Sequence, residues 1–395
     1  MQFAPQQDRA LAAVDTWFRN RNSPIFRLFG YAGTGKTTLA RHIAENVDGL
    51  VLFAAPTGKA AYVLKTKGCP NTSTIHQLIY TPKEKSQAKL KELQAKLVRE
   101  KARNPVVAQN VRDLEYLIDI EQKNLRRPSW NLNTDSLLKK AKLLIVDESS
   151  MVDESVGEDL LSFGVPILAL GDPAQLPPVA GAGFFTKQKA DFLLTDIHRQ
   201  ARDNPIIEMS RIVREGGTLN LGRYGDSEVV RGADFQRDWV FQADQILVGK
   251  NDTRRAYNAR IRELRGADRA YPLKGDKLVC LRNNHDSGLL NGSLWTVETA
   301  LDTGDGFVSL ELQGEESQRV ASVAHGCLFH GQNPEWYEKK EADEFDYGYA
   351  MTVHKSQGSQ WDDVLVIDEW FRNDRKQWLY TALTRAAKTV RVVKM

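Results

Sequence analysis

The chain has 395 residues, of which 42% are hydrophobic and 27% charged, and its formal net charge is +3. This length accommodates two core domains with insertions. There is no run of about 18 apolar residues, which predicts that no segment crosses a membrane. The first 13 residues lack the apolar core of a secretion signal, and the three cysteines form no CxxC pair. These features disfavour secretion, a zinc site and a disulfide framework, and they are typical of a cytoplasmic protein.

Charge is concentrated in one segment. Between Thr81 and Lys140 there are 14 Lys and Arg against 8 Asp and Glu, a local excess of six positive charges. Taken alone, such a stretch is usually a solvated helical face. It becomes relevant to nucleic acid only beside independent evidence for phosphate binding.

Five short apolar runs in the first half predict strands, and helical stretches separate most of them. The runs span residues 25–29, 51–55, 143–146, 167–170 and 192–194. They do not alternate with polar residues, which is typical of parallel strands buried on both faces. The pattern predicts a doubly wound α/β domain.

Polar clusters follow four of these runs. They are GYAGTGKT at 30–37, PTGK at 56–59, DESS at 147–150 and GDPAQ at 171–175. Ligands of open parallel sheets bind outside the carboxyl ends of the strands. The four clusters therefore predict one convergent site.

Two further segments read as insertions. Residues 81–136 carry Leu90, Leu93 and Leu97 on one helical stripe and a second apolar stripe from Val111 to Leu125, which predicts a helical hairpin. Residues 274–329 contain four strand-like runs with Asn291-Gly292 and Asp305-Gly306 between them, which predicts a small antiparallel barrel.

The rest of the second half predicts another α/β domain. Expected strands span 246–248, 349–353, 364–367 and 390–393, and expected helices span 254–264 and 377–387. Asp252 or Thr253 is the expected cap of the first helix, and Gly266 its end.

The segment from Gly30 to Thr37 matches GxxxxGK[ST], the P-loop pattern. Its glycines allow backbone N–H groups to surround phosphate oxygens, Lys36 would reach the β- and γ-phosphates, and the Thr37 hydroxyl would bind Mg²⁺. Asp147 and Glu148 offer one acid for Mg²⁺ and one for the attacking water. Gln175 suits contact with both a γ-phosphate and water. At this point a kinase acting on a small molecule remains open.

Nine motifs follow one another along the chain: Gln7, GYAGTGKTT, APTGKAA, TIH, VDESSM, LGDPAQLPPV, DIHRQ, YAMTVHKSQG and YTALTRA. Together and in this order they resemble superfamily 1 helicases. The TIH, DIHRQ and VHKSQG forms resemble the RecD-like and Dda-like branch, superfamily 1B, and the compact motor resembles phage or plasmid members. The resemblance implies two RecA-like domains. Domain 1A would comprise 1–80 and 137–197, insertion 1B 81–136, domain 2A 198–272 and 346–395, and an SH3-like insertion 2B 273–345.

The resemblance also implies roles at an ATP site. Gln7 would read adenine, Asp147 would support Mg²⁺, Glu148 would be the general base, and Gln175 would couple the γ-phosphate to the nucleic acid. Arg199 and Arg385 would be arginine fingers, although each alone would read as a surface ion pair. A predicted helical position for Arg385, four residues after Thr381, independently favours an inward direction. The remaining positions implied to contact the nucleotide are Gly30, Gly33, Thr34, Gly35, Lys36, Thr37, Thr38 and Gly358.

Other matching positions would hold a nucleic-acid strand. They are Pro56, Thr57, His76, Thr352, His354 and Lys355. Lone histidines are more often core or surface residues, so His76 and His354 depend on the resemblance. Phe184, Trp361 and Tyr380 are candidates for base stacking, although aromatic residues of this kind are more often core residues than stacking platforms.

The implied function is an ATP-dependent 5′→3′ DNA helicase or translocase, with ATP and Mg²⁺ as cofactors and single-stranded DNA and its junctions as substrate. The expected form is a monomer, with a replication, repair or single-strand-binding protein as a partner. The helical insertion departs from the short wedge hairpin of the family. A translocase without unwinding, an RNA motor and a non-hydrolysing binding subunit remain open, and the full set of Lys36, Glu148 and the arginines argues against the last.

Overall fold

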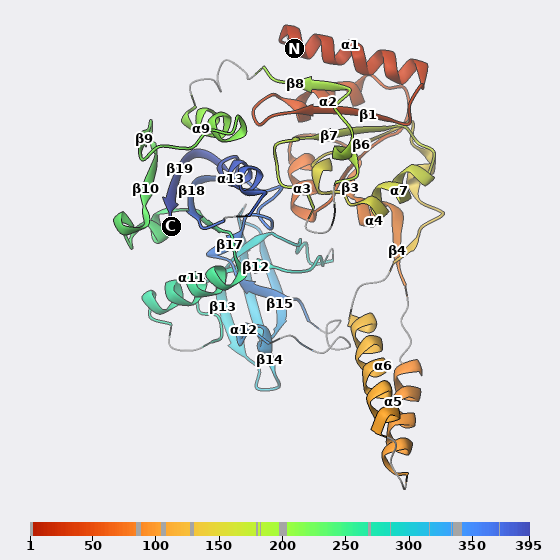
Figure 1. The fold of residues 1–395 in the computed structure, drawn as a ribbon, viewed down its shortest axis with the longest axis vertical. Helices are drawn as coiled ribbons and strands as arrows, with labels where there is room; N and C mark the ends of the chain where they lie inside the picture. Colours follow the sequence, from red (N-terminus) through yellow and green to blue (C-terminus); the bar gives the residue numbers. More distant parts are fainter. Residues whose placement is uncertain are drawn as a thin grey trace.

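The computed structural model describes residues 3–83, 88–103, 108–126, 130–178, 181, 183–196, 204–267, 270–284, 286–315, 317–332, 334, 342–370 and 372–395. It is built around two six-stranded sheets and one five-stranded sheet (Figure 1). Within the described ranges, no helix is both long and apolar enough to span a bilayer.

The first sheet, called here the N-terminal sheet, has the strand order β3-β2-β6-β7-β1-β8, and all of its pairs are parallel. Apolar clusters cover both of its faces. The strands are β1 Ile25–Gly30, β2 Val51–Ala55, β3 Thr72–Thr74, β6 Leu143–Val146, β7 Ile167–Gly171 and β8 Phe192–Leu194. The helices are α1 Pro5–Asn20, α2 Lys36–Glu45, α3 Gly58–Thr66, α4 Ile75–Ile79 and α7 Glu154–Ser162. The predicted α/β fold with a parallel core is confirmed; in this sheet, the short polar edge strand β3 was missed.

The C-terminal sheet has the order β17-β11-β18-β19-β10-β9, with β9 the one antiparallel strand. Its strands are β9 Gly222–Tyr224, β10 Ser227–Arg231, β11 Gln245–Val248, β17 Ala350–Thr352, β18 Trp361–Asp368 and β19 Ala386–Lys394. Its helices are α9 Pro205–Arg214, α10 Trp239–Gln242, α11 Asn251–Leu264 and α13 Arg375–Leu383.

Two local predictions in this half were wrong. The helix predicted to run to residue 387 ends at Leu383, because Ala386 already pairs with Trp361 and begins β19. Arg385 therefore lies in the turn after the helix. The cap of α11 is Lys250 rather than Asp252 or Thr253, because the Thr253 hydroxyl donates to Glu369 Oε2 at 2.7 Å instead.

The five-stranded antiparallel sheet has the order β15-β14-β13-β12-β16 and its own apolar core. It comprises β12 Lys277–Cys280, β13 Leu294–Asp302, β14 Phe307–Gly314, β15 Arg319–His325 and β16 Phe345–Tyr347. The short helix α12 Gly326–Phe329 lies between β15 and β16 in the chain. Gly292 and Gly306 have φ of +87° and +92°, which the turns before β13 and β14 require. β16 extends this sheet past the predicted boundary at 345, because it pairs with β12. Its likeness to an SH3 barrel stays a prediction.

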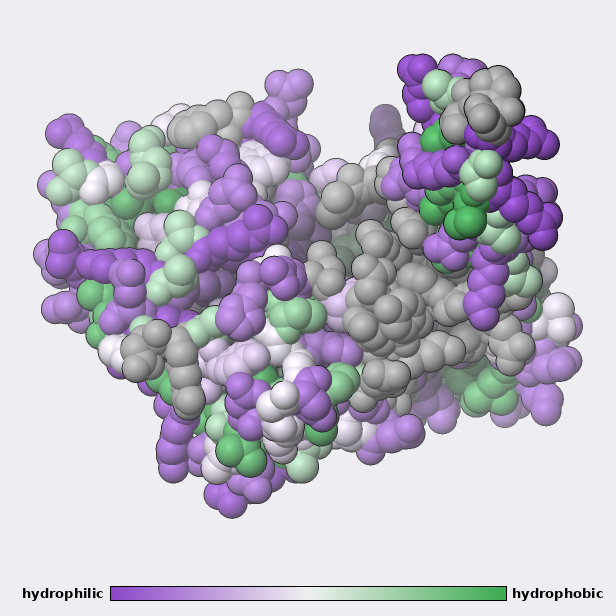
Figure 2. Space-filling model, turned by 90° about the horizontal axis from the view of Figure 1, so that it is seen from below, coloured by the Kyte–Doolittle hydropathy of each residue, from purple (hydrophilic) through white to green (hydrophobic). Residues whose placement is uncertain are grey.

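The insertion after α4 forms a projecting arm. A two-stranded ribbon of β4 Tyr80–Pro82 and β5 Trp130–Leu132 leads into α5 Ala88–Lys101 and α6 Ala108–Arg126. Figure 1 shows these two helices extending away from the sheets, and Figure 2 shows their surface as mainly hydrophilic. Ion pairs from Lys89 to Glu121 (3.2 Å) and from Lys101 to Glu115 (2.7 Å) join the helices.

Four short 3₁₀ helices complete the described elements: η1 Leu137–Lys140, η2 Ser149–Met151, η3 Phe185–Lys187 and η4 Gly232–Asp234.

Candidate functional site

The loop between β1 and α2 is shaped by glycine. Gly33 and Gly35 have φ of +78° and +81°, a region that side chains rarely adopt. A Cβ on Gly30 would lie 2.6 Å from Thr34 Oγ1, so a side chain there would displace the loop. Lys36 Nζ donates to the carbonyls of Gly30 (2.6 Å) and Tyr31 (3.1 Å), at the start of α2.

A cavity of about 800 Å³ lies beside this loop. It is larger than a second cavity of about 570 Å³ elsewhere in the structure. The larger cavity is lined by Gly33 to Thr38 together with Arg41, Thr66, Lys67 and Gly68. Its size, the helix N-terminus and the basic groups suit a polyphosphate. Sequence reasoning missed Arg41 and Lys67, because no motif marks them.

The predicted metal ligands come together at the carboxyl end of β6. Asp147 Oδ2 lies 3.4 Å from Thr37 Oγ1. Burial, and then the adjacent Glu148 carboxylate, raises the pKa of Asp147 to about 6. A hydroxyl beside a carboxylate is an oxygen donor set that Mg²⁺ accepts, and a cation there would favour the ionised form. These residues therefore fit Mg²⁺.

Glu148 stands in a strained backbone conformation. Its φ is +48° and ψ +38°, and its N–H donates to Asp147 Oδ1 at 2.9 Å. A non-glycine residue in this region costs free energy, and such residues cluster at functional sites. The strained residue, Glu148, is the one that the resemblance implies as the general base.

The loop after β7 is held by residues of the C-terminal half. Tyr380 Oη donates to Asp172 Oδ2 (2.6 Å) and accepts from the Ala32 N–H (3.2 Å). The Leu176 N–H donates to Thr381 Oγ1 (2.9 Å). Burial raises the pKa of Asp172 above its usual range. The two halves thus meet directly at the P-loop and the loop after β7.

Gln175 lies between these contacts. It is 9% exposed, and its Oε1 is buried without a hydrogen-bond partner among the described residues. A buried carbonyl oxygen without a donor is costly and uncommon, so it points to a ligand or water at this position. The orphan oxygen fits the predicted sensor role.

Gln7 and Arg385 have protein partners in this structure. Gln7 is buried, and its Nε2 donates to the Thr34 carbonyl of the P-loop at 3.1 Å. Arg385 is 6% exposed, and its guanidinium donates to Thr381 O, Ser359 O and Thr384 Oγ1, each at 3.2 Å. The structure brings Gln7 to the P-loop and holds Arg385 within the C-terminal half. Arg199 lies outside the described residues.

Several predicted strand contacts gather at the start of α3. Thr57 caps this helix, and its Oγ1 accepts from the Ala60 N–H at 3.2 Å. A Cβ on Gly358 would lie 2.9 Å from Ala60 Cβ and 3.3 Å from Thr57 Oγ1. Gly358, expected at the nucleotide, thus lies beside the predicted strand-binding residue Thr57. Pro56 directly precedes the cap.

The second group of predicted strand contacts follows β17. Thr352 ends that strand, and burial lowers the pKa of Lys355. The His354 ring lies 5.7 Å from that of Trp370. A lysine whose charge is partly desolvated gains from an anionic partner, which agrees with a phosphate contact.

The predicted stacking residues are poorly placed for a base. Trp361 and Tyr380 are 8% and 1% exposed, and Phe184 is half-buried with its ring 5.0 Å from Phe185. Trp130, which no motif marks, is 44% exposed on β5. Its ring meets that of His76 edge-on at 5.7 Å, which places an accessible aromatic beside a predicted strand contact.

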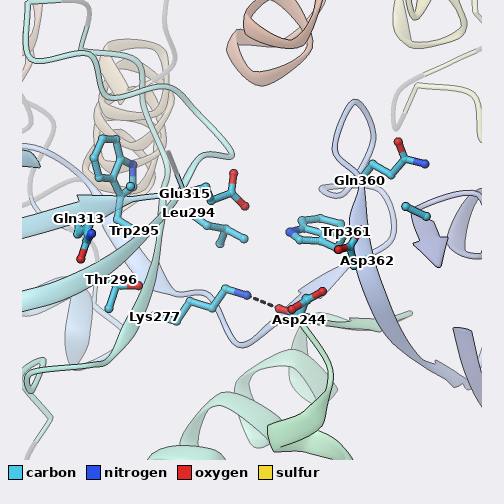
Figure 3. Close-up of a pocket in the computed structure, with 12 residues that line it drawn as sticks. Asp244, Lys277, Leu294, Trp295, Thr296, Gln313, Glu315, Gln360, Trp361 and Asp362 are labelled. Atoms are coloured by element: carbon cyan, nitrogen blue, oxygen red, sulfur yellow. Dashed lines mark hydrogen bonds between the residues drawn. The ribbon is translucent and has the colours of Figure 1, made fainter. Parts of the chain in front are cut away.

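The smaller cavity lies between the antiparallel and C-terminal sheets. In Figure 3, Lys277 extends toward Asp244 beneath Trp361, and its ammonium donates to the Asp244 carbonyl and to Gln245 Oε1. Burial lowers the pKa of Lys277 to about 8. None of the predicted nucleotide-site residues lines this cavity.

Lys277 gives a prediction for stability against pH. Its pKa in the folded state is below that of an unfolded lysine, about 10.4, so the unfolded chain binds the proton more tightly. The free energy of unfolding should therefore rise as the pH increases from about 8 to about 10. We expect Lys277→Met to stabilise the protein at pH 7 by roughly 1–3 kcal/mol and to flatten that rise. Urea unfolding across this pH range measures both effects, and the exposed Lys274→Met is the control. A wild-type stability that falls through this window would contradict the prediction.

Comparison with known proteins gives the family. A model of the AAA domain matches residues 3–234, more than half of the chain, and a model of the UvrD-like helicase C-terminal domain matches residues 347–393. The ATP-dependent RecD2 DNA helicase of Deinococcus radiodurans is 25% identical over 394 residues, covering 91% of this chain and 45% of that protein. The conjugal transfer protein TraA of Rhizobium radiobacter is 28% identical over 294 residues, covering 65% of this chain and 24% of that protein. The chain thus spans less than half the length of these relatives.

Solved structures share the fold. The Pif1 helicase from Bacteroides in complex with ADP-AlF3 and ssDNA is 18% identical, with a TM-score of 0.56, covering 99% of this chain and 92% of that one. Pif1 from Candida albicans is 19% identical, with a TM-score of 0.54, covering 100% and 95%. The chain therefore belongs to the AAA domain family, and the likeness to RecD-like helicases of superfamily 1B predicted from its motifs is confirmed.

Proposed function

We propose that the protein is an ATP-dependent motor that moves 5′→3′ along single-stranded DNA and unwinds duplexes. The observation that carries this proposal is that residues of the C-terminal half bond the P-loop and the loop after β7, next to a nucleotide-sized cavity lined by the N-terminal half. The Thr37–Asp147 pair lies at this site, and Tyr380 of the C-terminal half bonds to both the P-loop and Asp172. A change at the nucleotide can thus alter how the halves fit together.

In this proposal the N-terminal and C-terminal sheets are RecA-like domains 1A and 2A. The arm is insertion 1B, and the antiparallel sheet is insertion 2B. Lys36 would hold the β- and γ-phosphates, Thr37 and Asp147 would hold Mg²⁺, and Glu148 would orient and deprotonate the attacking water. When bound, Mg²⁺ would supply charge neutralisation for the transferred phosphoryl group.

The proposed strand path crosses the cluster at α3. Thr57 belongs to the first half and Gly358 to the second, and they lie side by side there. Lys59 of α3 forms an ion pair with Glu315, which follows β14 of the antiparallel sheet. All three sheets therefore border this region, and relative movement of the halves would shift their grip on a bound strand.

The test is ATP hydrolysis with and without single-stranded DNA. We expect strong stimulation by DNA, directional movement on tailed duplexes from a 5′ tail, and dependence on Mg²⁺. Stimulation by RNA alone would redirect the substrate, and movement without strand separation would indicate a translocase. Hydrolysis that is indifferent to both polymers would refute the proposed motor. Sedimentation of the complex would test the proposed monomer.

Trp130 gives a prediction for strand binding. We expect Trp130→Ala to weaken single-stranded DNA binding by ~5–160-fold, because stacking on an aromatic ring is worth ~1–3 kcal/mol per base. Trp130→Phe should retain most of the affinity. Fluorescence anisotropy with a labelled oligonucleotide measures the loss, and Phe241→Ala, an exposed aromatic on α10, is the matched control. Equal affinities for the wild type and Trp130→Ala would remove Trp130 from the strand path.

A further inference from the structure

Residues of the C-terminal half form hydrogen bonds with both ends of the loop Asp172–Leu176. At its start, Tyr380 Oη donates to Asp172 Oδ2 at 2.6 Å. At its end, the Leu176 N–H donates to Thr381 Oγ1 at 2.9 Å, and the Leu176 carbonyl accepts from Gln357 Nε2 at 3.0 Å. Tyr380, Thr381 and Leu176 are each at most 1% exposed. These bonds are therefore shielded from water and depend on the halves being together.

The buried Gln175 lies in the chain between the two ends that these hydrogen bonds hold. Within the loop, the Gln175 and Ala174 N–H groups donate to the carbonyl and the Oδ1 of Asp172, at 3.2 and 3.0 Å. A displacement of Asp172 or Leu176 would thus carry the Gln175 backbone with it. Tyr380 Oη also accepts from the Ala32 N–H, so one hydroxyl joins the P-loop to this loop.

We propose that the Tyr380 and Thr381 hydroxyls are positioning groups that place Gln175 at the nucleotide when the two halves close. Neither hydroxyl needs to touch the nucleotide, because each acts through the backbone or side chain that it bonds. This inference rests on the proposed motor function and names the groups through which domain closure would control hydrolysis.

The effect of losing each hydroxyl follows from burial. Thr381→Val is nearly isosteric but leaves the Leu176 N–H buried without an acceptor, and Thr381→Ser keeps the acceptor. We expect Thr381→Val to lower the DNA-stimulated kcat by ~10–100-fold with little change in KM for ATP, and Thr381→Ser to stay within about threefold of the wild type. Tyr380→Phe, which removes one oxygen, should lower kcat by about tenfold.

The experiment compares these three variants with the wild type and with Tyr224→Phe. Tyr224 is the control, because among the described residues its hydroxyl bonds only the backbone of Asn220, within its own half. For each protein, kcat and KM for ATP are measured with and without single-stranded DNA, together with nucleotides moved per ATP and the unfolding temperature. Positioning predicts that Thr381→Val and Tyr380→Phe lose kcat and the degree of DNA stimulation, while Tyr224→Phe and Thr381→Ser keep both.

Two results would overturn the inference. In the first, Tyr380→Phe and Thr381→Val keep the kcat and DNA stimulation of the wild type. In the second, Thr381→Ser falls as far as Thr381→Val, which would show that packing rather than the hydroxyl matters. A wild-type protein that DNA does not stimulate is a separate result, and it would overturn the proposed function together with this inference.

Discussion

Replacing Glu148 with glutamine is expected to lower kcat for ATP hydrolysis by ~10²–10⁴-fold, the range for loss of a general acid or base. The carboxylate follows β6 directly beside Asp147 and sits on a backbone with φ of +48°. Glutamine has the same shape but cannot accept the proton of the attacking water. ATP and single-stranded DNA should still bind, because Lys36, Thr37 and the strand contacts are unchanged.

The same variant has a second consequence at Asp147. The Glu148 carboxylate is the second cause, after burial, of the raised pKa of Asp147. Its removal should therefore lower that pKa and leave Mg²⁺-nucleotide binding intact or stronger. Rapid-quench kinetics and equilibrium binding of a labelled nucleotide measure the two effects. A variant that hydrolyses ATP at the wild-type rate would exclude Glu148 as the base.

Replacing Arg385 with alanine is expected to lower kcat by ~10³-fold or more, because an arginine finger contributes a factor of this size to phosphoryl transfer. In the described structure the guanidinium has three acceptors in its own half and is 6% exposed. To act at the nucleotide, it must exchange some of these bonds for phosphate oxygens. The substitution should also destabilise the fold by roughly 2–4 kcal/mol, because it removes a buried, hydrogen-bonded cation and leaves its acceptors without donors.

The two effects of Arg385→Ala can be separated by a matched control. Arg262 is equally buried, at 7%, and is paired with Asp276 at 3.1 Å within the same half. Arg262→Ala should lower the unfolding temperature but keep kcat per folded molecule. If Arg385→Ala behaves in the same way, with kcat retained in the folded fraction, then Arg385 is a structural residue and the finger assignment is wrong.

Local sequence determined much of the fold. Short continuous apolar runs identified β1, β2, β6, β7 and β8, because a strand buried on both faces needs apolar residues at every position. Glycines and the Lys-Thr pair identified the P-loop, because few other sequences let backbone N–H groups surround phosphate. Thr37 and Asp147 could also be paired in advance, since the carboxyl ends of parallel strands share one edge of the sheet.

Polar edge elements were harder to predict. β3 and β9 are short and largely polar, so periodicity does not mark them. The helix predicted to reach residue 387 ended early, because pairing of Ala386 with Trp361 overrode the local helical preference. These are places where tertiary contacts, not the segment itself, decide the conformation.

What the chain alone determined is the set of chemical groups and the strand ends at which they stand, since motif spacing and apolar periodicity are local properties. What only the tertiary structure decided is which groups meet across the two halves. Tyr380 was a candidate for base stacking that residue type alone favoured as a core residue, and only the structure shows that its hydroxyl bonds Asp172 and Ala32, residues more than 200 positions away. Trp130 was unmarked, yet it is the aromatic that stands exposed beside His76. Contacts between distant segments depend on how the sheets pack together, and no local pattern in the sequence records that packing.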